Sequence, residues 1–394
     1  MITRVLATVL TCLLLLGAGV YLGGHPEGLP GPVRDALVGD QDTRVVQEAI
    51  DEVRDTYYRD IPRDQLADES IRGLVKSLDD RFSNYFDPKE YAQFKQSQDS
   101  EFEGVGISVS QHPRGLRIAE VFDGSPAKRA GIEAGDVVIA VNGRSLKGRS
   151  QDQSVALIKG QPGTDVRLTL LHDGKERSET LTRSTISVPV VASKMETVDG
   201  TKLGVVRLAQ FSSGAHAEVY AAIRRALDKG AKGIVFDLRH NGGGLVTEAQ
   251  LVASAFLEKG KIVTTKGRSV PERSLSATGD AVAGKTPLVV LVDRDTASAS
   301  EIVAGALQDY GRAELVGTRT YGKGVFQQVI ELSNGGALDI TAGQYFTPKG
   351  RNLGGKGTAQ GAGLAPDVKA QDDPKTPKDE ALATALRTLQ REAA

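Results

Sequence analysis

The stretch PLVVLVDRDTASASEIVAGALQDYGRAELVGTRTYGKG, residues 287–324, decides the fold. Residues 288–292 form a short apolar run rich in β-branched side chains, which is typical of a buried strand. After a polar break, apolar residues recur at the spacing of one helix face: Ile302, Val303, Ala306 and Leu307. Residues 313–316 predict a second strand, which leads to the glycine-flanked Lys323. The stretch therefore predicts a strand, a helix and a second strand.

A serine group opens this helix and a lysine follows the second strand, which we interpret as a nucleophile and its base. A plainer role also fits the serines, because Ser298 followed by Glu301 is a capping box pattern. Residues 317–323 match a P-loop, but the eighth position is Gly324 instead of the Ser or Thr that holds magnesium. A strand is also predicted after it where a P-loop needs a helix, so nucleotide binding is disfavoured.

The chain has 394 residues, enough for two or three domains. Its 49 basic residues balance its 50 acidic ones, so nothing indicates nucleic acid as a partner. The single cysteine, Cys12, lies in an N-terminal apolar run, which excludes disulfides and cysteine metal sites elsewhere. We expect no metal and no cofactor, since the histidines lack metal-ligand spacing: His25, His112, His172, His216 and His240.

Residues 1–22 predict a signal peptide or a membrane anchor, because no charge occurs from position 5 to position 22. We favour an uncleaved anchor, followed by a Gly- and Pro-containing linker over 23–40. The bulk of the chain is then expected outside the cytoplasmic membrane, anchored to it, or secreted if the segment is cleaved.

Residues 41–100 predict a helical N-terminal region, with helices over 43–58 and 66–78 and a third that Pro88 opens after a turn. This region has no catalytic constellation, so its expected role is packing or pairing between subunits.

Residues 101–185 change to glycine turns and short strands. Ser125 and Lys128 match the S-x-x-K of penicillin-binding enzymes, but Ser125 followed by Pro126 also fits a helix cap, which we favour. The segment resembles a PDZ domain on three groups of residues: Gly104-Val105-Gly106-Ile107, Ser125-Pro126-Ala127 with Ala130-Gly131-Ile132, and Gly135-Asp136-Val137-Val138 with Val141-Asn142-Gly143.

That resemblance implies a module that adds a peptide to a sheet edge and holds its C-terminal carboxylate on loop amides. Val105, Gly106 and Ile107 are the expected cradle, and a helix around 153–158 is expected to wall the groove. An ordinary strand turn is the plainer reading of these glycines.

Residues 186–368 predict alternating strands and helices: 203–208, 217–227, 233–238 and 246–257. The loop after the strand 233–238 carries Gly242-Gly243-Gly244, which lets backbone amides approach a ligand. We predict a polar surface loop over 266–284 and a hairpin of strands 325–332 and 337–346. Residues 369–394 are the expected C-terminal helical tail, with a helix over 379–391.

From about Thr43 onward the chain resembles the carboxyl-terminal processing proteases, the PDZ-containing serine proteases of family S41. The resemblance rests on three motifs: Asp237-Leu238-Arg239 with Asn241 and the three glycines, Ser298-Ala299-Ser300-Glu301, and Tyr321-Gly322-Lys323-Gly324 followed by Gln327. It implies a multidomain α/β fold, with a mixed βαβ protease core and an inserted PDZ domain.

The resemblance also assigns roles. It makes Ser298 the nucleophile, Lys323 its base and Gln327 the residue that orients the lysine. The expected substrates are proteins or peptides with free C-termini. An adaptor lipoprotein and pairing of protomers through the helical ends are further implications of the resemblance.

Physical chemistry supports these roles. Lysine is a base only when neutral, and desolvation can lower its pKa of about 10.4 by up to ~3–5 units. Gln327, four residues after Lys323, would share its strand face. The amide of Ala299 and one from Gly243 or Gly244 are candidates for an oxyanion hole, because helix starts have unpaired amides.

Three alternatives stay open. A Ser-His-Asp triad would need His216 or His240, the two histidines of the second half, and the G-x-S-x-G elbow is absent. A catalytically inactive, membrane-anchored PDZ adaptor would bind C-termini without cutting them. A β-lactamase-like acyl enzyme would use the S-x-x-K at Ser125.

Overall fold

The computed structural model describes residues 41–98, 101–355 and 363–393. The predicted leader 1–22 and linker 23–40 lie outside these residues. Among the helices of the described ranges, none combines the length and the apolar content that a bilayer span requires. The chain divides into two compact units, residues 1–79 and 80–394.

The described residues of the first unit form α3 (Gln41–Thr56) and α4 (Arg63–Lys76), which confirm the first two predicted helices. The two helices contact each other along their apolar faces. These faces line an open apolar groove with Val46, Ile50, Val53, Leu66, Ile71 and Leu74. Val46 and Leu74 stay more than half exposed, so much of this apolar surface is uncovered within the unit.

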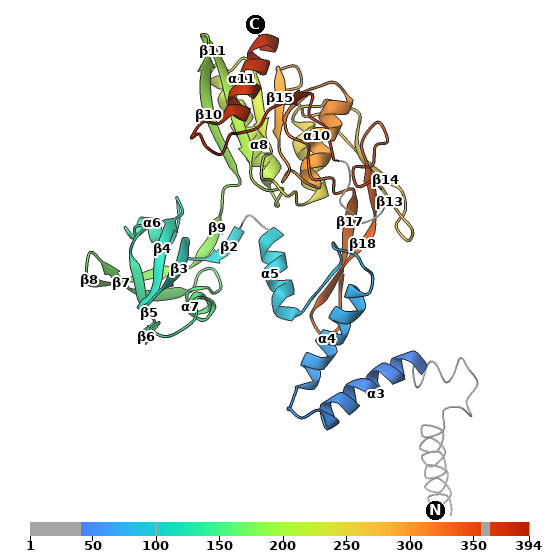
Figure 1. Ribbon diagram of the computed structural model, residues 1–394. Coiled ribbons are helices and arrows are strands. Elements are labelled where there is room, and N and C mark those ends of the chain that lie inside the picture. Colours follow the sequence, from blue (N-terminus) through green and yellow to red (C-terminus); the bar gives the residue numbers. More distant parts are fainter. Residues whose placement is uncertain (1–40, 99–100, 356–362, 394) are drawn as a thin grey trace, which may run out of the picture. The chain divides into compact units, whose positions relative to one another are not determined.

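The second unit contains a small antiparallel sheet of order β3-β4-β5-β7-β8, with β6 pairing on β5 (Figure 1). Its strands are β3 (Ile107–His112), β4 (Gly115–Val121), β5 (Val137–Val141), β6 (Arg144–Ser145), β7 (Asp165–His172) and β8 (Lys175–Thr182). Two helices, α6 (Pro126–Arg129) and α7 (Gln151–Ile158), complete it. The ribbon of β2 (Glu101–Gly104) and β9 (Ser184–Ser187) brackets this module in the sequence.

The S-x-x-K motif of this module is a helix cap, as favoured. Ser125 is the N-cap of α6 and its hydroxyl accepts a hydrogen bond from the Lys128 amide at 3.1 Å. Pro126 occupies the first helical position. The hydroxyl is therefore engaged in capping, which argues against a second acyl-enzyme site there.

A second sheet has the order β10-β11-β12-β15-β16-β19. Its strands are β10 (Val191–Val198), β11 (Thr201–Leu208), β12 (Ile234–Asp237), β15 (Leu288–Val292), β16 (Glu314–Gly317) and β19 (Val368–Lys369). All neighbours pair in parallel except β10, which is antiparallel. The predicted strand–helix–strand stretch is confirmed as β15, α10 (Ala299–Asp309) and β16.

Both faces of this sheet are buried, because side chains alternate along each strand. On one face Val290 and Leu315 join the core formed by α8 (Ala215–Asp228), α9 (Val246–Ser254) and α10. On the other face Val289 and Leu291 pack with α11 (Glu380–Ala393). The all-apolar sequence of β15 follows from this double burial.

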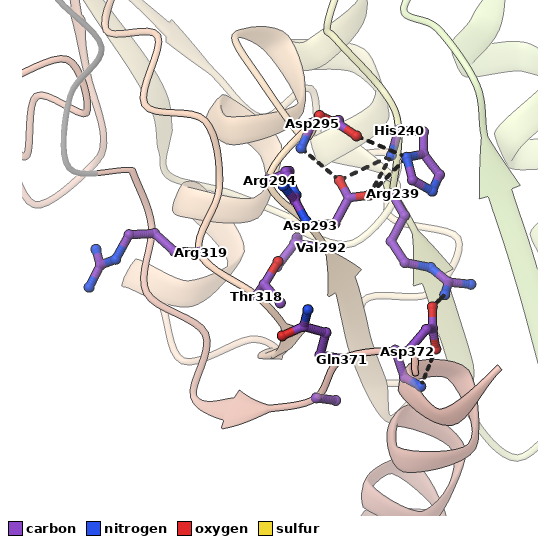
Figure 2. A pocket seen from close by; sticks show the side chains of 12 residues that line it. Arg239, His240, Val292, Asp293, Arg294, Asp295, Thr318, Arg319, Gln371 and Asp372 are labelled. Atoms are coloured by element: carbon purple, nitrogen blue, oxygen red, sulfur yellow. Dashed lines mark hydrogen bonds and ion pairs between the residues drawn. The ribbon is translucent and has the colours of Figure 1, made fainter. Parts of the chain in front are cut away.

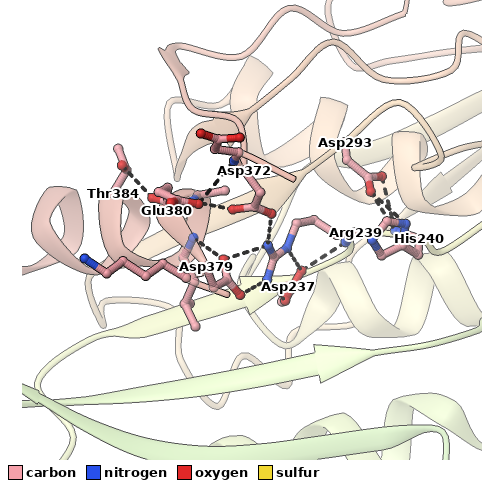
Figure 3. A network of polar contacts seen from close by, with 12 residues as sticks. Asp237, Arg239, His240, Asp293, Asp372, Asp379, Glu380 and Thr384 are labelled. Atoms are coloured by element: carbon pink, nitrogen blue, oxygen red, sulfur yellow. Dashed lines mark hydrogen bonds and ion pairs between the residues drawn. The ribbon is translucent and has the colours of Figure 1, made fainter. Parts of the chain in front are cut away.

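Polar contacts also hold α11 to the sheet (Figure 3). Arg239 follows β12 in the sequence. Its guanidinium donates to the carboxylates of Asp237, Asp372 and Asp379, with bonds of 2.8 Å to both Asp379 oxygens. Asp379 in turn accepts from the Leu382 amide in the first turn of α11. One arginine thus joins the end of a core strand to the start of the last helix.

A five-stranded antiparallel sheet has the order β1-β18-β13-β14, with β17 also on β18. Its strands are β1 (Asn84–Phe86), β13 (Lys261–Gly267), β14 (Arg273–Ser276), β17 (Val325–Glu331) and β18 (Ala337–Phe346). The β17–β18 hairpin confirms the predicted one. Two predictions were wrong here: β1 lies in the predicted turn before Pro88, and β13–β14 occupy part of the predicted 266–284 loop. β1 and β13 each pair with β18, and β14 pairs with β13. The local sequence of these strands does not reveal β18 as a partner.

Candidate active site

Ser298 lies at the N-terminus of α10, after the loop that leaves β15. Its φ is 56°, in the left-handed region that residues other than glycine rarely adopt. The loop before it is held by Asp293, whose carboxylate accepts from the amides of Asp295 and Thr296. The Thr296 hydroxyl donates to the carbonyl of Leu238 after β12. A strained backbone that several bonds enforce is typical of functional positions.

Glu301 connects the two candidate catalytic residues. Its Oε2 accepts from the amides of Ser298 at 3.0 Å and Lys323 at 2.9 Å. Its Oε1 accepts from the Thr320 hydroxyl at 2.6 Å and the Gly322 amide at 2.8 Å. Burial raises the pKa of the Glu301 carboxyl, and these four hydrogen bonds work in the opposite direction. The sequence predicted the bond to Ser298 as a cap, but not the bonds to the lysine loop.

Lys323 is half-buried between β16 and β17. Burial lowers the pKa of its ammonium, and the carboxylates of Asp339, Asp80 and Glu301 offset part of that effect. Its Nζ lies 4.9 Å from the centroid of the Phe82 ring. The net lowering favours the neutral amine that a base requires.

The glycine loop after β12 lies directly against the start of α10. A side chain on Gly243 would come within 2.8 Å of the Ser298 Cβ and 3.0 Å of the Ala299 nitrogen. The Gly243 amide donates to Asn241 Oδ1 at 2.9 Å. In the described ranges, no acceptor is found for the amides of Gly244 and Ala299. Of the predicted oxyanion donors, Ala299 and Gly244 therefore have amides without an acceptor among the described residues, whereas the Gly243 amide is already engaged.

Asn241 locks this loop to both neighbouring elements. Its side-chain amide donates to the carbonyl of Leu208, and its own carbonyl accepts from the Ser300 hydroxyl at 2.9 Å and from the Ala297 amide. Asn241 is completely buried. The Ser300 hydroxyl thus holds the glycine loop against α10, which is a structural contact and not helix capping, and Ser298 remains the candidate nucleophile.

Gln327 lies on β17 opposite Thr341, and its Nε2 donates to the Thr341 hydroxyl at 3.1 Å. Lys323 precedes the strand, and a bulge separates Phe326 from Gln327. The alternation of side chains therefore does not place Gln327 and Lys323 on one face, as the sequence argument assumed. Their contact stays a prediction.

The two histidines that a triad would need are held by other carboxylates. His216 Nδ1 lies 2.9 Å from buried Glu248. Figure 2 shows exposed His240 beside Asp293 and Asp295, at 3.0 and 3.1 Å. Neither arrangement supports a Ser-His-Asp triad at Ser298.

His240, Asp293 and Asp295 are the one group in the described ranges whose ligand atoms could meet at a metal. These atoms lie within 4.8 Å of one another. The Asp293 carboxylate already accepts hydrogen bonds from the amides of Asp295 and Thr296, so the group stabilises the loop that precedes Ser298.

In the small module, β3 pairs with β4 alone and forms a sheet edge. Gly106 precedes β3 with a φ of 81°, and a side chain there would come within 2.2 Å of the Ser125 Cβ. The carbonyl of Val105 accepts from the Ala127 amide, and Val105 is buried. With Ile107 opening β3, the predicted cradle lies at the start of an edge strand, the geometry that strand addition of a peptide requires.

Known proteins share this architecture. The model of peptidase family S41 matches residues 202–370, and the PDZ domain model matches residues 104–182. The chain is 36% identical over 355 residues to a carboxyl-terminal-processing protease of Synechocystis sp., covering 86% of this chain and 83% of that protein. It is 34% identical over 373 residues to the carboxy-terminal processing protease CtpA of Bacillus subtilis, covering 94% of this chain and 76% of that protein.

A solved structure agrees with these matches. The photosystem II D1 C-terminal processing protease is 30% identical and superposes with a TM-score of 0.51, covering 90% of this chain and 99% of that one. The S41 core, the PDZ module and the extent of the identity lead to one conclusion: this chain belongs to the carboxyl-terminal processing proteases, the PDZ-containing peptidases of family S41.

Proposed function

We propose that the protein is a serine endopeptidase in which Ser298 is the nucleophile, Lys323 its base and Gln327 an assisting residue. The observation that carries the proposal is the Glu301 carboxylate, one oxygen of which accepts from the amides of both Ser298 and Lys323. This shared acceptor brings the backbones of the two residues together, and a nucleophile with a base within its reach is the arrangement that covalent hydrolysis requires.

The first half of the reaction acylates the serine. Neutral Lys323 takes the Ser298 hydroxyl proton while Oγ attacks the peptide carbonyl. The oxyanion that forms is held by the amides of Ala299 and Gly244, which have no acceptor among the described residues. Lys323 then gives its proton to the departing amine as the C–N bond breaks.

The second half releases the acyl group. Water loses a proton to Lys323 and attacks the ester, and the proton returns to Ser298 as the ester bond breaks. Gln327 assists by accepting a hydrogen bond from the lysine through Oε1, because its Nε2 donates to Thr341. The chemistry requires no cofactor.

The PDZ module gives the enzyme its substrate class. Strand addition at β3 would hold a C-terminal tail, with the tail carboxylate on the amides around Gly106. A free protein C-terminus is the group such a cradle fits. The apolar N-terminal run further supports an extracytoplasmic enzyme attached to the membrane, which substrates of that compartment would reach.

The test compares the full chain with Ser298→Ala on an unstructured protein such as casein, with Ser276→Ala as a control. Ser276 is an exposed serine on β14. We expect cleavage by the wild type and the control, and loss of about 10³-fold or more in Ser298→Ala, because the nucleophile is gone.

Equal cleavage by Ser298→Ala would refute the assignment. No cleavage by the wild type, with retained binding of tail peptides, would instead favour the inactive PDZ adaptor.

A further inference from the structure

Tyr345 carries a buried hydroxyl with no hydrogen-bond partner in the described part of the chain. The residue is the penultimate one of β18 and is only 1% exposed. Leaving a buried hydroxyl unpaired is unfavourable, because it loses its water without gaining a protein partner. Such a group calls for an explanation other than packing, since phenylalanine would fill the same space.

The surroundings of the phenol supply one. The phenol experiences the charge of the Glu301 carboxylate, and the Ser298 hydroxyl is near enough to interact with it without forming a well-aligned hydrogen bond. Burial and the Glu301 charge raise the pKa of the Tyr345 phenol, and the Ser298 hydroxyl works in the opposite direction. The phenol therefore keeps its proton and remains a donor throughout the pH range in which a peptidase works.

The backbone of Tyr345 holds it beside the lysine loop. Its amide donates to the carbonyl of Gly324, the residue after Lys323, at 3.1 Å. Asn352 then joins the two, because its side-chain amide donates to the carbonyls of Gly324 at 2.9 Å and Tyr345 at 3.0 Å. The backbone of Tyr345 is thus held at the residue that follows Lys323.

We propose that Tyr345 is a further catalytic residue, whose hydroxyl donates a hydrogen bond to Ser298 Oγ as the serine loses its proton. The inference rests on the proposed function. The Ser298 proton goes to Lys323 Nζ and Tyr345 retains its own, so the phenol is a donor and not an acid. Catalytic hydrogen bonds are often long or poorly aligned without substrate and tighten only in the substrate complex.

The bond matters most when charge develops on Oγ. A hydrogen bond to a charged oxygen is roughly twice as strong as one between neutral groups. Tyr345 therefore stabilises the transition state more than the resting serine, and its loss should lower kcat and leave KM nearly unchanged.

The experiment uses Tyr345→Phe in the full chain, which removes one oxygen and keeps the ring. The control is Tyr310→Phe, because the Tyr310 hydroxyl donates to the Lys261 carbonyl at 2.9 Å in the same unit. The measurements are kcat and KM on a quenched peptide, the rate of labelling of Ser298 by a fluorophosphonate, and the melting temperature.

We expect kcat and the labelling rate of Tyr345→Phe to fall together by about 10- to 100-fold, with KM within about twofold. The melting temperature should be unchanged or higher, because an unpaired buried hydroxyl has been removed. Tyr310→Phe should match the wild type in kcat and labelling.

Unchanged kcat in Tyr345→Phe would overturn the inference. A lowered melting temperature or failure to fold would also overturn it, because the hydroxyl would then be a structural donor. Ser298→Ala separates the two proposals: if that variant is inactive while Tyr345→Phe is fully active, the proposed function stands and only the role of Tyr345 fails.

Discussion

At the scale of single residues, the site depends on groups in conditions that folding alone would not favour. Ser298 holds a left-handed backbone, and Lys323 is placed where burial disfavours its charge. The backbone strain at Ser298 costs about 1–3 kcal/mol of stability. The burial of Lys323 shifts its protonation equilibrium towards the neutral amine. Glu301, fully buried with four donors around it, offsets part of that cost and couples the two residues.

Lys323 leads to a prediction about pH. In the proposed mechanism the neutral amine of Lys323 is the active form, so kcat/KM should rise with pH through the folded-state pKa, with a midpoint below the ordinary ~10.4. Burial lowers that pKa, and Asp339 is the first of the carboxylates that oppose it. Asp339→Asn should therefore lower the pKa further and move the rising limb to lower pH.

The measurement is a pH profile of kcat/KM for wild type, Asp339→Asn and Asp199→Asn. Asp199 lies in an exposed turn, so its variant should follow the wild-type curve. Lys323→Ala should be inactive across the range. A limb that stays in place in Asp339→Asn, or activity in Lys323→Ala, would assign the base to another group.

At the scale of elements, the contact between the glycine loop and α10 sets the site. Gly243→Ala is expected to lower kcat by about 10²–10³-fold, because its Cβ would push against the Ser298 Cβ and the Ala299 nitrogen and displace an oxyanion donor. The backbone at Gly243 also has a φ of 106°, which alanine resists.

Gly242→Ala is the matched control for this variant. A side chain at Gly242 meets nothing within 4 Å, so the neighbouring substitution should leave kcat near the wild-type value. Steady-state kinetics on one peptide decide the matter. Equal kcat for Gly243→Ala and Gly242→Ala would mean that the loop does not support the oxyanion.

The last helix provides a test of the core. Leu389 of α11 is fully buried, and its side chain lies against Gly233, where an added Cβ would come within 2.8 Å of it. Leu389→Ala should lower the free energy of unfolding by about 2–5 kcal/mol, because a cavity opens on that face of the sheet. Arg387→Ala, at an exposed position of the same helix, should change it by less than about 0.5 kcal/mol.

Urea denaturation curves of the two α11 variants measure this difference. Equal stability of Leu389→Ala and Arg387→Ala would show that α11 does not contribute to the protease core.

At the scale of the whole molecule, the proposed function combines a PDZ module that would capture C-terminal tails with a peptidase core. Amidating the C-terminus of a peptide substrate removes the negative charge that the amides around Gly106 would hold. We expect kcat/KM to fall by about 10- to 100-fold, as for the loss of a charge-assisted hydrogen bond. Acetylating the N-terminus of the same peptide should have no effect.

Kinetics on the matched peptides, with competition by a free tail peptide, make the measurement. Indifference to amidation would refute tail capture but leave the Ser298 chemistry intact.

The local pattern of the sequence determined much of this protein. The strand–helix–strand of residues 287–324, the β17–β18 hairpin and the cap at Ser125 follow from periodicity and turn chemistry, which act between near neighbours. Ser298, Lys323 and Gln327 stand out as candidates because family motifs are short and contiguous.

Contacts between residues that are far apart in the sequence could be read from the tertiary structure alone. It brought Glu301 to the lysine loop, Tyr345 to Ser298 and Asp80 to Lys323, and it paired β1 with β18 in a segment predicted to be a turn. The physical reason is that these contacts depend on strand register and burial, which are properties of the packed chain and not of any window of its sequence.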